Sequence, residues 1–286
     1  MTAETALHAH TACVWEVMAR KVGNVHPGAS FDALGYQDFL HSAGSLAAAL
    51  VGGPAAGVGE TILRAVRLRT LLTPSNTNLG IILLLVPLAK AASRSDLEKL
   101  LATLTVGDAR FAYEAIRMAS AGGLGEVPEE SVASEPTVTL LDAMRLAAHR
   151  DTIARQYANG FADVFDFGVP RLLAAFERFG CVEAAIVDCQ LRWLAEFPDS
   201  LIVRKCGTEF ATEVRQRVSG ALAMGGLDTV AGRAAGVHLD GFLRSESNRY
   251  NPGTTADLVT ACLFVALREG RLKASDPFRW RTDEWL

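Results

Sequence analysis

The stretch Asn251-Pro252-Gly253-Thr254-Thr255-Ala256-Asp257 leads directly into the apolar segment Leu258–Leu267. Pro252 fixes its own φ and disfavours a helical conformation of the residue before it. Gly253 permits backbone angles that other residues resist. The pattern therefore predicts a tight turn that enters a buried helix.

Two interpretations of this turn remain open from the sequence. If Thr254 is the N-cap, Asp257 falls at the third helical position, which is the spacing of a capping box. The segment would then be an ordinary helix start. Alternatively, a glycine-containing turn before a helix presents free N–H groups and the positive end of the helix dipole, which together bind phosphate.

The rest of the chain repeats the helical spacing, and no run alternates with the two-residue period of a strand. We predict an all-α fold, a single domain of about twelve helices over residues 1–286. Ala121–Pro136 is rich in glycine and glutamate, and we expect a flexible segment there, either a lid or a surface linker. Besides Leu258–Leu267, the expected helices are Ala3–Lys21, Tyr36–Val51, Gly59–Leu72, Ile81–Ala92, Ser95–Leu104, Val106–Ala119, Thr137–Tyr157, Val169–Phe179, Val182–Phe197, Ser200–Ser219 and Leu227–Asp240.

Composition excludes several classes of protein. The 286 residues are 50% hydrophobic and carry a formal net charge of −4, so neither nucleic acid nor an anionic membrane is an expected partner. The most apolar run, Leu79–Ala89, is about half as long as a membrane span requires. The five cysteines are scattered without a CxxC pair, which favours reduced thiols in a cytoplasmic protein. The N-terminus shows no signal-peptide pattern.

Three polar turns that contain glycine meet the ends of predicted helices: Lys21–Gly28, Pro74–Gly80 and Asn251–Asp257. Each is explained by capping alone, but together they favour one shared site for a polyanion. Lys21 is expected to be exposed at the first turn. The carboxylates Asp32, Asp151 and Asp257 could hold a Mg²⁺ ion that carries a triphosphate. The six histidines do not have a metal-ligand spacing on one helix.

Five segments, in order along the chain, resemble the triphosphoribosyl-dephospho-CoA synthase family. The last is the most specific. They are Lys21-Val22-Gly23-Asn24-Val25-His26 with Asp32 and Phe39…Ser42-Ala43; Asn76-Thr77-Asn78-Leu79-Gly80; Arg150-Asp151; Pro198-Asp199-Ser200-Leu201-Ile202-Val203-Arg204; and Asn251-Pro252-Gly253-Thr254-Thr255-Ala256-Asp257-Leu258.

The resemblance implies an all-helical enzyme that joins the triphosphoribosyl group of ATP to the 2′-hydroxyl of dephospho-CoA and releases adenine, with Mg²⁺. It implies catalysis by Asp32, Asp151 and Asp257, with Asp32 and Asp257 as metal ligands, and it allows for a homodimer. The implied nucleotide and phosphate ligands are Lys21, Gly23, Asn24, His26, Asn76, Thr77, Asn78, Arg150, Arg204, Asn251, Gly253 and Thr254.

The chain departs from the family at its first turn, where Arg20-Lys21-Val22-Gly23 replaces the usual Pro-Lys-Pro-Gly. The segment Asn78-Leu79-Gly80 also lacks the nearby basic residue of the lyase-associated members. Both changes concern the acceptor more than the nucleotide. Two alternatives therefore stay open: a related enzyme with another acceptor in one-carbon cofactor biosynthesis, such as tetrahydromethanopterin or methanofuran, and a non-catalytic nucleotide-binding or scaffold protein.

Overall fold

The structure is a computed structural model that describes residues 2–31, 34–53, 55–73, 77–119, 134–282 and 285. These residues form fourteen α-helices, a π-helix and a 3-10 turn. The part of the chain described contains no strand, only isolated bridges between His26 and Ala29 and between Phe31 and Leu34. The prediction of an all-α fold is confirmed, with slightly more helices than expected.

The chain divides into two compact units, each made of two segments. Unit 1 comprises Met1–Cys13 and Gln37–Val164, and unit 2 comprises Val14–Tyr36 and Phe165–Leu286. The prediction of a single domain stays a prediction. The first eight α-helices are α1 (Ala3–Met18), α2 (Tyr36–Val51), α3 (Val58–Thr70), α4 (Leu79–Lys90), α5 (Arg94–Ala102), α6 (Val106–Met118), α7 (Leu140–Ala147) and α8 (Thr152–Ala158).

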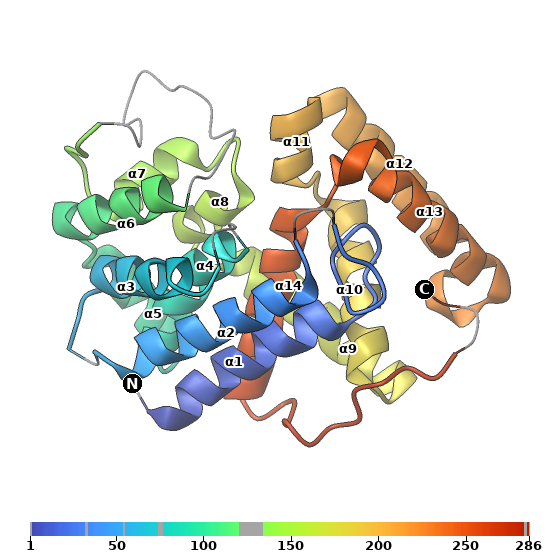
Figure 1. Ribbon diagram of the computed structural model, residues 1–286, viewed down its shortest axis with the longest axis horizontal. Helices are drawn as coiled ribbons and strands as arrows, with labels where there is room; N and C mark the ends of the chain where they lie inside the picture. The colour runs from blue at the N-terminus through green and yellow to red at the C-terminus, as the bar shows by residue number, and fades with distance from the viewer. Residues whose placement is uncertain are drawn as a thin grey trace. The chain divides into compact units, whose positions relative to one another are not determined.

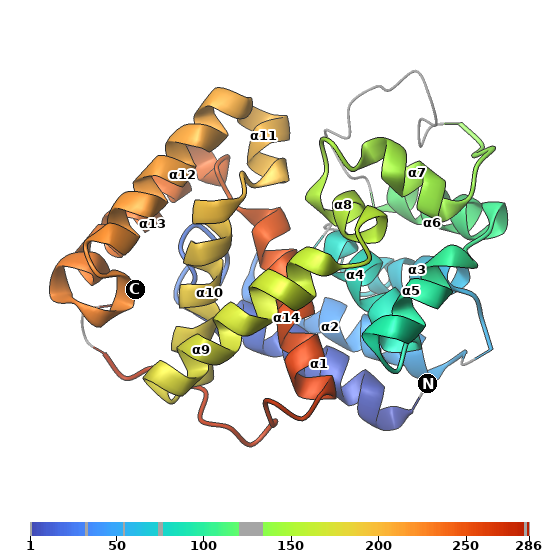
Figure 2. The same ribbon diagram turned by 180° about the vertical axis from the view of Figure 1, so that it is seen from behind.

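The remaining elements are η1 (Asp163–Gly168), α9 (Val169–Phe179), α10 (Val182–Glu196), α11 (Ser200–Cys206), α12 (Thr208–Ala223), η2 (Gly226–Asp228), α13 (Val230–Asn248) and α14 (Gly253–Arg268). Within unit 2, α14 lies beside α9 and α10, and α12 runs beside α13 (Figures 1 and 2). Within unit 1, α3 packs against α4 and α6, and α7 packs against α8. Figure 1 shows these neighbours by their labels.

Helix α14 is apolar around its whole circumference, and its residues from Leu258 to Leu267 are all buried. A helix with apolar residues on every face has to lie inside the protein. Helix α4 is its counterpart in unit 1, and its buried residues run from Leu79 to Ala89 apart from Gly80. The apolar run at Leu79–Ala89 is therefore a core helix, as its length indicated.

Two of the predicted helices are each two helices in the structure. Thr137–Tyr157 divides into α7 and α8 because Asp151 caps a new helix, its side chain accepting the Ala154 N–H at 3.0 Å. Ser200–Ser219 divides into α11 and α12 at Gly207, whose φ of 88° no helix accommodates. Most of Ala121–Pro136 lies outside the described residues.

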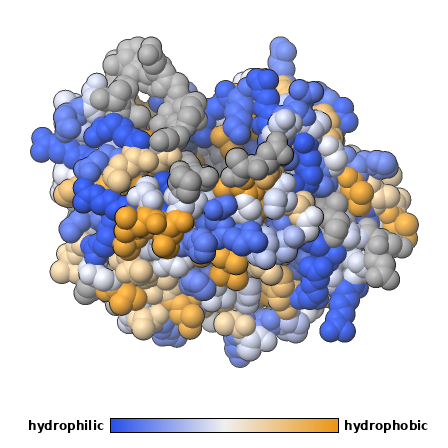
Figure 3. Space-filling model, in the orientation of Figure 1, coloured by the Kyte–Doolittle hydropathy of each residue, from blue (hydrophilic) through white to orange (hydrophobic). Residues whose placement is uncertain are grey.

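The face in Figure 3 carries hydrophilic residues interspersed with smaller hydrophobic groups. Exposed apolar side chains are normal on a folded protein when they are scattered. No helix among the residues described is both long and apolar enough to cross a membrane.

Candidate functional site

The loop that follows α1 is fixed from both sides by buried polar side chains of unit 2. Gln190 of α10 accepts the Val22 N–H at 3.1 Å and donates to the Val22 carbonyl at 2.9 Å. The same amide donates to the Asn24 side chain at 2.7 Å. Asp240 of α13 accepts the Gly23 N–H at 2.7 Å. The loop is therefore held in one conformation by helices that come much later in the sequence.

Gly23 is required at its position by two independent features. Its φ is +69°, in the left-handed region that disfavours other residues. A Cβ atom there would lie 2.7 Å from Leu243 Cβ and 3.0 Å from Pro252 Cδ. The close approach brings the loop against α13 and against the turn that starts α14.

The first and last of the family-like segments meet directly. The Asn24 amide donates to the Asn251 Oδ1 at 2.6 Å, across 227 positions of sequence. Asn251 is half-buried and precedes α14, which begins at Gly253. The predicted binding residues Asn24, Asn251 and Gly253 thus belong to one cluster in unit 2.

Asp199 brings a third segment into this cluster and caps two helices at once. Its Oδ1 accepts the N–H groups of Leu201 and Ile202 at 2.9 and 3.1 Å at the start of α11. Its Oδ2 accepts the N–H and the hydroxyl of Thr255 at 2.7 and 2.8 Å at the start of α14. Burial raises the pKa of Asp199, and the hydrogen bonds from Thr255 and from the backbone oppose that rise.

The predicted capping box of α14 is wrong. Pro252 occupies the N-cap, no side chain of α14 caps it, and the buried Thr254 hydroxyl instead accepts a hydrogen bond from Ser200 at 3.1 Å. Asp199 takes over the capping role from another helix, so the Thr255 N–H is not available to a phosphate. Asp257, counted from Gly253, is the fifth residue of α14 and lies beyond the first turn. Capping therefore does not explain Asp257.

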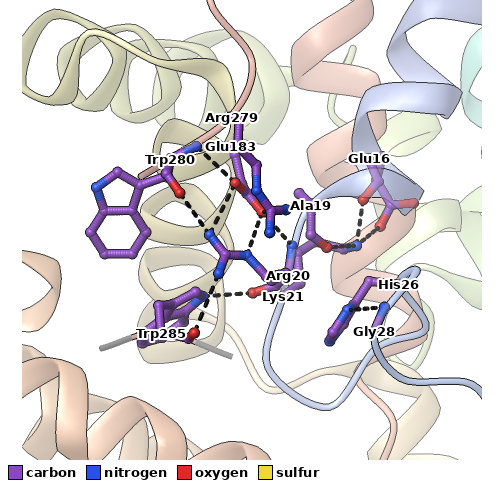
Figure 4. A network of polar contacts seen from close by, with 10 residues as sticks. All are labelled: Glu16, Ala19, Arg20, Lys21, His26, Gly28, Glu183, Arg279, Trp280 and Trp285. Carbon is purple, nitrogen blue, oxygen red and sulfur yellow. Dashed lines mark hydrogen bonds and ion pairs between the residues drawn. The ribbon is translucent and has the colours of Figure 1, made fainter. Parts of the chain in front are cut away.

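Lys21 is fully buried, so the expectation that it is exposed is wrong. Its ammonium group donates to the Glu16 carbonyl at 2.5 Å and lies 3.0 Å from the Glu16 carboxylate (Figure 4). A longer contact of 3.4 Å joins it to the Ala19 carbonyl. Burial lowers the pKa of Lys21 and raises the pKa of Glu16, and the attraction between them opposes both shifts. Phosphate binding by Lys21 stays a prediction and requires the ammonium to leave these partners.

Arg20, the residue before Lys21, is paired with the buried carboxylate of Glu183. The Arg20 Nε donates to Glu183 at 2.8 Å, and the Trp280 N–H donates to the other carboxylate oxygen at 2.8 Å. Trp285 donates its indole N–H to the Arg20 carbonyl at 2.9 Å. These contacts bind the C-terminal segment to the end of the first helix (Figure 4).

His26 is neutral and keeps one ring nitrogen without a partner. Its Nδ1 accepts the Gly28 N–H at 3.2 Å, which places the ring proton on Nε2 (Figure 4). Burial, followed by the positive charges of Arg244 and Lys21, lowers the pKa of His26 to about 3. The ring is 3% exposed, and Nε2 has no hydrogen-bond partner.

Four other predicted residues of the nucleotide site belong to unit 1: Asn76, Thr77, Asn78 and Arg150. Thr77 and Asn78 are buried; the Thr77 hydroxyl pairs with the Ser42 hydroxyl, and the Asn78 amide donates to the Ser42 carbonyl at 3.1 Å. Ser42 belongs to the first family-like segment, so two segments also meet in this unit. Arg150 is exposed, Asp151 is the N-cap of α8, and Asn76 lies outside the described residues.

The described residues do not form a metal cage. No group of three or more histidine, cysteine, aspartate or glutamate side chains among them could hold an ion. Asp32, one of the two predicted metal ligands, lies outside the described part of the chain, and Asp257 is half-buried in α14. The described residues thus do not fit a protein-enclosed Mg²⁺ site.

Sequence reasoning missed the helix side chains that hold the first loop, Gln190, Asp240 and Arg244. Asp240 and Arg244 stand one helical turn apart, a spacing that favours ion pairs. That signal was present, but the predicted helix ended at Asp240, before the kink that begins at Ser245. Arg204, a predicted phosphate ligand, is exposed in the last turn of α11.

Known proteins are similar to this chain in sequence. A probable 2-(5''-triphosphoribosyl)-3'-dephosphocoenzyme-A synthase of Stutzerimonas stutzeri is 32% identical over 113 residues, which are 39% of this chain and 38% of that protein. One of the same name from Pseudomonas savastanoi pv. phaseolicola is 26% identical over 175 residues, 58% of this chain and 56% of that protein. The matches thus span little more than half of these relatives at most.

The likeness extends to a solved structure. A candidate triphosphoribosyl-dephospho-CoA synthase of Archaeoglobus fulgidus has a TM-score of 0.64 and 28% identity, covering 81% of this chain and 98% of that one. The sequence model of the family described as ATP:dephospho-CoA triphosphoribosyl transferase matches residues 2–276. The chain belongs to the ATP:dephospho-CoA triphosphoribosyl transferase family.

Proposed function

We propose that this protein transfers the triphosphoribosyl group of ATP to the 2′-hydroxyl of dephospho-CoA and releases adenine. The observation that carries this proposal is the junction of Asn24 with Asn251, supported by the capping of Thr255 by Asp199. It gathers three family-like segments, distant in the sequence, into one cluster. The two alternatives, another acceptor or a non-catalytic protein, have no specific observation in their favour.

The proposed reaction calls for a carboxylate close to this cluster. Loss of adenine from C1′ builds positive charge on the ribose, which a carboxylate stabilises, as in glycoside hydrolysis. Asp257 is the best placed of the three predicted carboxylates, because it lies in α14, whose first residues contact Asp199 and Ser200. Asp151, in contrast, is accounted for by its capping of α8.

Mg²⁺ is proposed to arrive with the nucleotide. This ion usually keeps several waters and binds to proteins through one or two carboxylates together with substrate phosphates. A cage of protein ligands is therefore not required, and Asp257 with Asp32 would supply the carboxylates.

The five cysteines are free, in agreement with the proposed cytoplasmic location, and a homodimer stays an expectation.

The test is adenine release from Mg-ATP with dephospho-CoA, followed by chromatography, in the wild type and in Asp257→Asn. We expect release that depends on dephospho-CoA, and a loss of about a hundredfold or more in the variant, since the amide keeps the shape but removes the charge. Thr254→Ala is the matched control in the same turn and should act mainly on stability. A wild type that releases no adenine contradicts the proposed function; an active Asp257→Asn contradicts only the role of Asp257.

A further inference from the structure

Two hydrogen-bond donors beside the first loop are buried and have no partner. They are the Nη1 group of Arg244 and the Nε2 group of His26. Buried polar groups in native proteins are nearly always hydrogen-bonded, so each exception calls for an explanation. The two unpaired donors lie in the same region of unit 2, because Arg244 donates to the Asn24 carbonyl in the loop that carries His26.

Arg244 is fixed in place by its remaining donors. Its Nε donates to both carboxylate oxygens of Asp240 at 2.9 and 2.7 Å. Its Nη2 donates to the Asn24 carbonyl at 2.6 Å. Because the guanidinium group is planar, these contacts also set the direction of Nη1. The unpaired donor is thus held in position and is not a mobile side-chain end.

The charges around His26 favour an anion. The positive charges that lower its pKa are those of Arg244, Lys21, Arg20 and Arg279. Glu16 pairs with Lys21, Glu183 pairs with Arg20 and Arg279, and Asp240 pairs with Arg244. Every carboxylate in this set is engaged with a cation, whereas two donors are left over. The two unpaired donors of Arg244 and His26 can therefore bind a ligand group that accepts hydrogen bonds and donates none.

We propose that Arg244 and His26 together bind one oxyanion group of the substrate, the guanidinium through Nη1 and the neutral imidazole through Nε2–H. A phosphoryl oxygen is the ligand chemistry that fits, because it accepts hydrogen bonds and cannot donate them. This inference rests on the proposed function and specifies the residues that receive its triphosphate. Arg244 becomes a substrate-binding residue, and Asp240 a positioning residue that orients it.

The segment after Arg244 has a strained backbone, and we expect it to move when the ligand enters. Glu246, Ser247 and Asn248 have φ values of 52°, 56° and 62°, three successive left-handed residues without a glycine. Such backbone is strained and is found at switch regions and ligand clamps. Glu246 and Ser247 are exposed, and the strained turn connects Arg244 to Asn251. Oxyanion binding is expected to shift this turn.

A pair of His26 variants separates ligand binding from a structural role. The amide nitrogen of glutamine can replace the Nε2 donor, whereas the amide oxygen of asparagine can replace the Nδ1 acceptor for the Gly28 N–H. We expect His26→Gln to keep most of the affinity for inorganic triphosphate and His26→Asn to lose about tenfold or more, measured by calorimetry. The opposite order would overturn the role of Nε2.

The Arg244→Lys variant tests the guanidinium. Lysine keeps the charge and can pair with Asp240, but its single nitrogen cannot also reach the Asn24 carbonyl and the position of Nη1. We expect a loss of about 10- to 100-fold in affinity for inorganic triphosphate and for Mg-ATP in a variant that stays folded. Arg233→Lys, earlier on α13, is the matched control and should bind normally.

A spectroscopic measurement completes the test. In wild-type protein with ¹⁵N-labelled histidine, triphosphate should shift the Nε2 resonance of His26, and that shift should be absent in Arg244→Lys. If Mg-ATP binds and neither the resonance nor the variants respond, this proposal is overturned and the proposed function stands. If the wild type binds neither triphosphate nor Mg-ATP, both are overturned.

Discussion

The ammonium group of Lys21 has three N–H donors, and acceptor oxygens of two nearby residues in the sequence, Glu16 and Ala19, surround it. Two belong to Glu16 and one is the Ala19 carbonyl. Removing one partner of a buried ion pair leaves an uncompensated charge, which costs about 3–5 kcal/mol. We therefore expect Lys21→Ala to lose that much free energy of unfolding in urea titrations, even without nucleotide.

Lys99 provides the control for this prediction. It is a 75% exposed lysine that lies 3.5 Å from Asp96 on α5. An exposed ion pair contributes between zero and about 1 kcal/mol. If Lys21→Ala is no less stable than Lys99→Ala, the buried pair with Glu16 does not exist in solution.

His26 makes the stability of the protein depend on pH. Its folded pKa of about 3 lies below the unfolded value of about 6.5, so the unfolded state binds more protons between these values. The stabilisation is complete above pH ~6.5 and is lost as the pH falls, by at most ~1.4 kcal/mol per pH unit. In urea titrations, His26→Gln should lose less stability than the wild type between about pH 6 and pH 4.

His149→Gln gives the matched comparison, because it removes an exposed imidazole instead of the buried one. Parallel losses in the wild type and in His26→Gln would show that the imidazole titrates normally in the folded protein. The assignment of a neutral donor at Nε2 would then fail.

At the level of helices, one carboxylate serves the starts of both α11 and α14. Asp199 accepts four hydrogen bonds, three from backbone N–H groups. A single N-cap contributes about 1 kcal/mol, and each buried donor left unsatisfied costs about 1–3 kcal/mol. Asp199→Ala should therefore destabilise the protein by several times as much as Thr139→Ala, which removes the cap of α7. Equal effects in chemical denaturation would contradict the shared cap.

The same carboxylate shows where sequence reasoning reached its limit. The apolar run and the Pro-Gly turn correctly indicated a buried helix near Leu258, and Asp199 stood in a segment that matched the family. Its partner Thr255, however, is 56 positions away. A local capping rule assigned the start of α14 to Thr254 and Asp257, because it cannot represent a cap supplied by another helix.

For the whole molecule, periodicity was sufficient for the all-α class and for most helix positions. It failed where one polar residue starts a new helix inside a continuous pattern, as Asp151 does. The family-like segments identified Asn24 and Asn251, but their contact depends on long-range packing. Gln190 could not be found from spacing alone, and the spacing of Asp240 and Arg244 indicates an ion pair but not the loop that Arg244 holds.

Binding of Mg-ATP should stabilise the whole protein. A ligand that binds only the native state adds about 2.7 kcal/mol at a hundred times its dissociation constant. For a chain of this size, that corresponds to a rise of several degrees in melting temperature. Scanning calorimetry with millimolar Mg-ATP should show this rise, and Asp257→Asn should show most of it because the triphosphate contacts remain. Mg²⁺ alone and adenine alone serve as controls and should have little effect. An unchanged melting temperature with Mg-ATP would mean that the cluster around Asn24 and Asn251 does not receive the nucleotide.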